Sequence, residues 1–291
     1  MAQYILSAFA DEACNSLTGQ IDALRRNHIG FIEPRSIDGP ILDKSEDELS
    51  EIRRTFDANG IRVSSLGSPI GKYPIDQPFD EHYCLFSHAL RACEILGTDR
   101  MRIFSFFVTQ DKKAEYRDEV MRRMNAMLDE ADRHGITLCH ENESAIYGQN
   151  PDEVGDLLAS LPRLHGVFDA ANYIMNDQSA ELGLNKTMLR FSYMHVKDAV
   201  YTGHKIVAAG EGDTDYPRVL DHVGRAVDGT VYLTVEPHLF EFDAYKLIDK
   251  RAFPSGKNFS KSDAAFDYAV SKLKEVLISL GYHEEGYVWK K

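Results

Sequence analysis

Four side chains that could bind a metal ion or transfer a proton each come near the end of a short apolar segment. Glu141 ends GITLCHEN, Asp169 lies in HGVFDA, His195 in RFSYMHVKDAV and Glu236 in TVYLTVEP. A strand that only stops at the surface needs a turn residue such as Gly, Asn or Pro, not a carboxylate or an imidazole. Because the pattern recurs in four successive apolar segments, it indicates one shared site.

Three carboxylates and one imidazole are a donor set for a divalent cation. Such ligands suit Mn²⁺, Mg²⁺, Co²⁺ or Zn²⁺, and the lack of a thiolate argues against a structural zinc. Without a cation, three carboxylates crowded away from water would repel one another. A single carboxylate at a strand end is usually a helix N-cap or a surface group, but four successive cases are hard to explain in that way. We therefore predict one divalent metal ion, bound by Glu141, Asp169, His195 and Glu236.

The elements that must position these residues alternate along the whole chain. The apolar segments are YILSAF, GFIEP, IRVSSL, MRIFSFF, ITLCHE, GVFDA, FSYMHVKD and TVYLTVE. The pattern after each segment predicts a helix, over about 16–28, from 45 to 59, 80–96, up to 134, from 150, 180–188, from 215 and 262–280. A capping box at Ser45–Glu48, Pro151 at a first helical position, and Gly97 and Gly281 after helix ends support these boundaries.

Strands that alternate with helices form parallel sheets, and near-continuous apolar strands suit a sheet covered on both faces. Eight strand–helix units in 291 residues predict an α/β protein with a single (β/α)₈ TIM barrel over residues 1–291. An open doubly wound sheet is the alternative, but no G-x-G-x-x-G turn follows a strand. In a barrel, the four candidate ligands would end the fifth to eighth strands, at the rim where such barrels place their sites.

Other polar residues near strand ends could contact a substrate. Glu33 could bind a hydroxyl and Arg35 a carboxylate or phosphate, although a surface ion pair explains both equally well. Lys197 could touch substrate or form a salt bridge, and His238 could line the pocket. Two more residues are expected to be structural, with Asp198 fixing a loop and Lys72 a solvated loop lysine.

Composition restricts the class of protein. A formal net charge of −13 argues against nucleic-acid binding, because proteins that bind phosphates usually carry a basic face. No run approaches the roughly 18 apolar residues of a membrane helix. The N-terminus lacks a basic segment of the kind that begins a secretory signal. Four cysteines without a C-x-x-C pair predict reduced thiols in a cytoplasmic protein.

Taken together, several motifs resemble one known family. Glu141-Asn142, Asp169, His195-Val196-Lys197-Asp198 and Glu236, with GEGDTDY at 210–216, resemble the xylose isomerase-like barrels, which include sugar-phosphate isomerases/epimerases and ketose 3-epimerases. The resemblance covers nearly the whole chain. It implies that the four candidate ligands hold the metal, that Glu141 and Glu236 are also the catalytic acid/base pair, and that the substrate is a small sugar or sugar phosphate.

The chain departs from this family at two positions. Many members have a His three residues after the Asp, where it meets a substrate oxygen, whereas this chain has Asn172, which can hydrogen-bond but cannot carry a positive charge. Many also have a His after the Glu-Asn pair, where this chain has Glu143.

An inosose dehydratase-like lyase with the same metal site is the alternative function. A nuclease would need more histidines and a basic face, and a non-catalytic sugar-binding barrel would have lost a ligand. A homo-oligomer is compatible with the sequence but is not identified by it.

Overall fold

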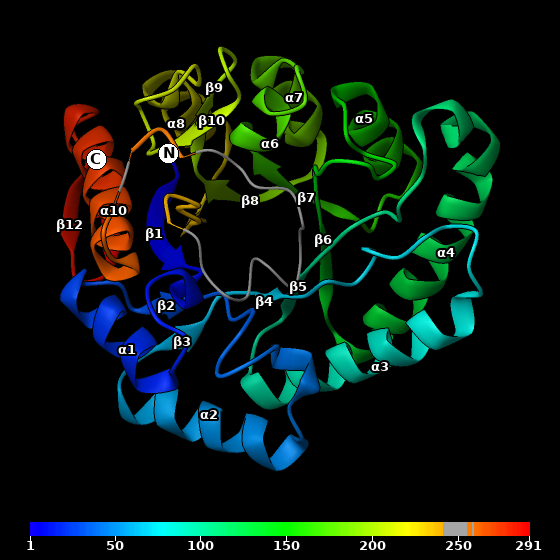
Figure 1. Ribbon diagram of the computed structural model, residues 1–291, viewed down its shortest axis with the longest axis horizontal. Coiled ribbons are helices and arrows are strands. Elements are labelled where there is room, and N and C mark those ends of the chain that lie inside the picture. The colour runs from blue at the N-terminus through cyan, green and yellow to red at the C-terminus, as the bar shows by residue number, and fades with distance from the viewer. Residues whose placement is uncertain (241–254, 258) are drawn as a thin grey trace.

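The computed structural model describes residues 1–240, 255–257 and 259–291. Parallel strands form the centre and helices surround them (Figure 1). The strands of the barrel are β1 (Gln3–Ala8), β2 (Phe31–Ile32), β3 (Arg62–Val63), β4 (Leu66–Gly67), β5 (Arg100–Ile103), β6 (Thr137–Glu141), β7 (His165–Asp169), β8 (Phe191–Val196) and β11 (Thr230–Val235). The predicted TIM barrel is confirmed, with its third strand divided into β3 and β4.

Backbone hydrogen bonds close the barrel. Parallel pairing runs continuously from β4 through β5, β6, β7, β8 and β11 to β1. Beyond β2, the backbone N–H of Glu33 donates to the carbonyl of Ala8 at 3.0 Å, and the N–H of Gly67 donates to that of Pro34 at 3.1 Å. These two bonds join β1, β2 and β4. A C-terminal hairpin of β12 (His283–Glu285) and β13 (Val288–Lys290) adds antiparallel pairing to β1.

Apart from the short α6, which the sequence analysis did not predict, the described helices begin and end close to the predicted bounds. They are α1 (Leu17–Arg26), α2 (Glu46–Ala58), α3 (Phe79–Leu96), α4 (Lys113–His134), α5 (Pro151–Ser160), α6 (Ala170–Ile174), α7 (Ala180–Thr187), α8 (Tyr216–Ala226) and α10 (Ser262–Ser279). Ser45 and Glu48 form the predicted capping box. Asn150 caps the helix that Pro151 opens. Gly97 ends α3 in the left-handed conformation.

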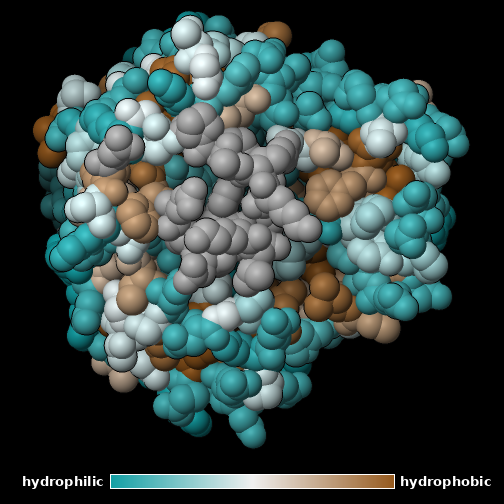
Figure 2. All heavy atoms as spheres, viewed as in Figure 1, coloured by the Kyte–Doolittle hydropathy of each residue, from teal (hydrophilic) through white to brown (hydrophobic). Residues whose placement is uncertain are grey.

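One further hairpin and four 3₁₀ turns complete the described elements. β9 (Asp198–Val200) and β10 (Lys205–Val207) form an antiparallel hairpin after β8. Single 3₁₀ turns lie at η1 (Ala10–Glu12), η2 (Ile41–Asp43), η3 (Gln110–Lys112) and η4 (Met188–Arg190). On the face shown in Figure 2, hydrophilic residues predominate around the outer rim. Within the described ranges, each helix is too short or too polar to cross a membrane.

The two-residue period of the strands separates two apolar layers. Leu138, Phe168 and Met194 belong to the large core, which includes the buried helix faces. Cys139, Val167 and Tyr193 form a separate small cluster inside the barrel. Because successive side chains of a strand point to opposite faces, the residues two positions further on also point inward. Those residues are Glu141, Asp169 and His195.

Gly71, in the loop after β4, provides a test of the rim next to the site. Its φ is +88°, and a Cβ there would collide with the backbone of Phe104. Gly71→Ala should therefore lower the free energy of unfolding by more than about 2 kcal/mol, because backbone strain and steric overlap add. Gly60→Ala is the matched control, since Gly60 has a similar φ of +70° but no atom within 4 Å. It should cost only about 1–2 kcal/mol. Equal losses in urea denaturation would contradict the collision.

Candidate functional site

The four predicted ligands meet at the carboxyl ends of their strands. One ligand atom from each of Glu141, Asp169, His195 and Glu236 lies within 4.8 Å of the others. All four residues are buried, with exposed fractions of 3% or less. Glu141 and Asp169 are the last residues of β6 and β7, His195 is the penultimate residue of β8, and Glu236 follows β11. The structure therefore brings together the set that the sequence indicates.

Basic and amide groups hold both oxygens of Glu141 and both oxygens of Glu236. Arg102 donates from Nη1 to Glu141 Oε2 at 2.7 Å, and Asn172 donates from Nδ2 to Glu141 Oε1 at 3.1 Å. Glu236 accepts from Arg35 at 2.9 Å through Oε1 and from Lys197 at 2.7 Å through Oε2. These contacts fix the carboxylates before any ligand binds.

Asp169 has two functions at once. Its Oδ1 accepts the backbone N–H of Asn172 at 3.0 Å and so caps α6. Its Oδ2 is buried without a hydrogen bond, although Lys197 Nζ forms an ion pair with it at 2.9 Å. Asp169 is thus a helix N-cap through Oδ1, as is common for an Asp at a strand end. Its other carboxylate oxygen, Oδ2, points toward the other three candidate ligands and could bind a metal ion.

His195 is oriented as a metal ligand would be. Its Nε2 lies 3.3 Å from Oε1 of Glu33. The other carboxylate oxygen of Glu33, Oε2, accepts a hydrogen bond from Thr234 at 2.9 Å. Nδ1 of His195 lies 3.1 Å from Glu141 Oε1 and 3.7 Å from Glu236 Oε2, but it is buried without a hydrogen bond. A carboxylate behind one imidazole nitrogen commonly leaves the other nitrogen to bind a metal. Two ligand atoms without a hydrogen bond, His195 Nδ1 and Asp169 Oδ2, therefore fit a cation at the centre.

The pKa values of Glu141 and Glu236 are lowered, because neighbouring cationic groups outweigh the effect of burial, whereas those of the other two candidate ligands are raised. Burial raises the pKa of Asp169 to about 7, although Lys197 opposes the change. Burial lowers the pKa of His195, but the charges of Glu141 and Glu33 outweigh it and raise that pKa to about 10. Both shifts favour additional positive charge at the centre, whether a proton or a metal ion supplies it.

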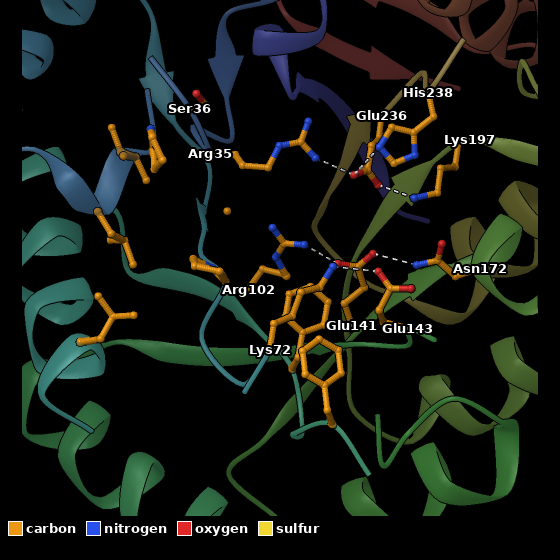
Figure 3. A pocket seen from close by; sticks show the side chains of 18 of the residues that line it. Arg35, Ser36, Lys72, Arg102, Glu141, Glu143, Asn172, Lys197, Glu236 and His238 are labelled. Carbon is orange, nitrogen blue, oxygen red and sulfur yellow. Dashed lines mark hydrogen bonds and ion pairs between the residues drawn. The ribbon is translucent and has the colours of Figure 1, made fainter. Parts of the chain in front are cut away.

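A cavity of about 330 Å³ opens beside the four ligands. Figure 3 shows its polar side, where Arg35, Arg102 and Lys197 point toward the carboxylates of Glu141 and Glu236. Apolar residues supply much of the remaining wall, namely Pro40, Ile41, Leu42, Pro69, Leu85, Phe104, Phe107, Met175 and Ile206. The cavity is large enough for a small organic molecule.

The predicted substrate-binding residues divide into two groups. Arg35, Asn172, Lys197 and His238 line the cavity. Glu33 does not line it, because it lies inside the barrel with no exposed surface and accepts from Tyr193 at 2.8 Å. This depth suits a residue that orients His195 better than one that contacts a substrate hydroxyl.

Two expectations about loop residues have different outcomes. Asp198 does fix a loop, since its carboxylate accepts the backbone N–H groups of Ala199 and Gly212 at 2.8 and 3.0 Å. The expectation that Lys72 is solvated is wrong. Its Nζ binds Glu143 at 3.0 Å and lies 4.5 Å from the centroid of the Phe104 ring, in the cavity wall.

Sequence reasoning missed three charged residues of the site. Arg102 lies within β5, between the buried Met101 and Ile103, and a cation inside a buried strand was the available signal. Asp11 and Glu12 lie in η1 after β1, and both are buried around Arg35 at 2.9 and 3.3 Å. Burial also raises the pKa of Glu12 to about 8.

Comparison with known proteins defines the class. A family model for the xylose isomerase-like TIM barrel matches residues 21–251, so the chain belongs to that family. The search of curated proteins finds no match. The fold, however, is widely shared among solved structures.

Three solved structures illustrate the likeness of the fold. A D-tagatose 3-epimerase-like protein is 12% identical with a TM-score of 0.72, over 95% of this chain and 98% of that one. The probable 3-DHS dehydratase AsbF from Bacillus anthracis is 11% identical with a TM-score of 0.70, over 94% and 99%. The IOLI protein with a binding zinc atom is 16% identical with a TM-score of 0.71, over 95% and 99%.

Proposed function

We propose that this protein is a divalent-metal-dependent isomerase or epimerase of a small sugar or sugar phosphate. The observation that carries the proposal is the convergence of four buried donor groups beside a cavity, two of them with a ligand atom that makes no hydrogen bond. The names of two structural relatives, an epimerase-like protein and a protein with a bound zinc atom, support it. The free thiols of Cys14, Cys84, Cys93 and Cys139 support a location in the reducing cytoplasm.

Glu141, Asp169, His195 and Glu236 would hold Mn²⁺, Mg²⁺, Co²⁺ or Zn²⁺. When bound, such an ion stabilises the negative charge that develops on a carbonyl oxygen as the adjacent carbon loses its proton. Glu33 keeps the imidazole of His195 in the orientation that presents Nδ1 to the centre. The proposed ligands are thus held in place by hydrogen bonds and ion pairs to other residues of the protein.

Glu141 and Glu236 are the proposed acid/base pair. Both line the cavity, from β6 and from the end of β11. One carboxylate takes the proton from carbon, breaking the C–H bond, and the other returns a proton to the opposite face of the same carbon. The substrate keeps all its oxygen atoms, and the configuration inverts. Arg35 and Lys197 restrain Glu236 in this role.

Other cavity residues would bind the substrate. Lys197 and His238 lie next to Glu236, and Asn172 lies next to Glu141, so each can reach a hydroxyl of a molecule bound between the two glutamates. Asn172 offers a neutral amide. The apolar wall that includes Phe104 and Ile206 would keep bulk water away from the reacting carbon.

A lyase is the second candidate, because the same groups could start a dehydration. The structural relative named as a probable dehydratase supports this alternative. After the same proton removal, the substrate would expel a β-hydroxyl as water. The two reactions therefore differ in the product and not in the groups that begin them.

Turnover in deuterium oxide should distinguish the two reactions. We expect metal-supplemented protein, screened on free and phosphorylated ketoses and on inososes, to incorporate deuterium at the inverted carbon with no loss of oxygen. The exchange follows because the returning acid equilibrates with solvent. Mass spectrometry of the mixture gives the answer. A main product lighter by one water would establish the lyase and exclude the epimerase.

A further inference from the structure

Arg102 differs from the other basic residues of the cavity. Lys197 holds both Asp169 and Glu236, Lys72 is paired with Glu143, and Arg35 binds three carboxylates. Arg102 makes one hydrogen bond to a described residue, from Nη1 to Glu141 Oε2 at 2.7 Å. A guanidinium has five N–H donors. Most of the donor capacity of Arg102 is therefore unused within the described part of the chain.

The unused donors are costly where they lie. Arg102 is only 5% exposed, and its Nε is buried without a hydrogen bond. Burying a donor without an acceptor is unfavourable, more so when the donor is charged. Figure 3 shows the guanidinium pointing into the cavity between Arg35 and Glu141. Arg102 lines the cavity, so a ligand there is the partner that could accept from its donors other than the buried Nε.

The surroundings restrict what that ligand can be. The guanidinium carbon of Arg102 lies 4.6 Å from the centroid of the Phe104 ring and 5.5 Å from that of Phe9. These rings shield the guanidinium without accepting its in-plane hydrogen bonds. A planar acceptor with two oxygens matches such a donor group best. Among the described residues, the other cation that lies over Phe104 is Lys72, which is already paired, so the site suits a single negative charge better than a phosphate dianion.

We propose that Arg102 binds a carboxylate of the substrate, and that the substrate is accordingly a polyhydroxy acid such as a sugar acid. The proposal rests on the proposed function, because it places the carboxylate beside the carbon on which Glu141 and Glu236 act. Arg102 then has two tasks. One N–H fixes Glu141, and the remaining N–H groups select acidic over neutral substrates.

Calorimetric binding to matched pairs tests the proposal. The probes are D-glucose with D-glucuronate and D-galactose with D-galacturonate, together with the 6-phosphate of each sugar, all with Mn²⁺-loaded protein. At least one uronate should bind about tenfold or more tightly than its neutral partner and its phosphate, as expected for a charge-assisted hydrogen-bonded pair. Arg102→Gln should remove this preference, and Arg102→Lys should retain only part of it because it lacks the planar fork.

Lys72→Gln is the matched control, since it removes a cation over the same ring but one that is already neutralised by Glu143. It should keep the preference for the acid within about twofold. Absence of any uronate preference in the wild type, a preference for the phosphates, or a preference that survives Arg102→Gln would each overturn the proposal. Metal content of the same samples, measured by elemental analysis, reports separately on the proposed metal-dependent function.

Discussion

Glu236→Gln and Glu141→Gln should each lower kcat by about 10²–10⁴-fold, the usual contribution of general acid–base catalysis. Gln keeps the shape of the side chain and one oxygen that can bind a metal, but it cannot accept a proton. Each variant should therefore still bind a substrate analogue. Steady-state kinetics and calorimetry on the same preparations measure the two properties independently.

Glu143→Gln provides the comparison for this prediction. Glu143 lines the same cavity but lies outside the group of four ligands, and its carboxylate is engaged by Lys72. Its loss should reduce kcat by less than about tenfold, which is small beside the loss of a general base. If both Glu236→Gln and Glu141→Gln retained more than about a tenth of the wild-type kcat, they could not be the acid/base pair.

The strands and helices could be predicted because local signals agree with the tertiary structure. The capping box at Ser45, the Pro at 151 and the glycine at 97 each set a boundary through backbone chemistry that acts within a few residues. The candidate ligands could be predicted for a related reason. Strand ends of a parallel barrel meet at one rim, so the repeated position of a polar group in four segments is enough to place the groups together.

How deeply a polar side chain is buried, and which charged residue it pairs with, could not be predicted, because both depend on residues far apart in the chain. Glu33 and Arg35 both follow β2 closely, so their positions in the sequence look alike. Only the three-dimensional structure shows that Tyr193 and Thr234 donate to the carboxylate of Glu33 inside the barrel. The sequence position of Lys72, in a Gly/Pro-rich loop, favours solvent. The structure instead pairs it with Glu143, 71 positions away. Nothing local distinguishes these cases.

Arg102 shows a second reason why a site residue could be missed from the sequence. A strand pattern predicts which face a residue occupies, yet a cation among Met101, Ile103 and Phe104 looks unfavourable until its partners are known. Those partners are Glu141 at 2.7 Å and the rings of Phe9 and Phe104. A charged residue inside an otherwise apolar strand should thus be treated as a candidate site residue whenever neighbouring strands end in carboxylates.

Purified protein should contain about one divalent metal ion per chain, and His195→Ala should weaken the binding of that ion by more than about 100-fold. His195 contributes the single nitrogen of the donor set, and its buried Nδ1 makes no hydrogen bond. Elemental analysis after gel filtration and competition with a chelator give the content and the affinity. Metal content unaffected by His195→Ala would show that the ion binds elsewhere.

Glu33→Gln tests whether Glu33 binds the metal ion itself or only orients the imidazole of His195. Glu33 lies 3.3 Å from Nε2 of His195, is outside the group of four ligands and has no exposed surface. Its replacement should leave the four donors in place but weaken the restraint on the imidazole, so metal affinity should fall by about 10–100-fold, less than in His195→Ala. Equal losses in the two variants would make Glu33 a ligand in its own right, and no loss in Glu33→Gln would mean that His195 needs no carboxylate behind it.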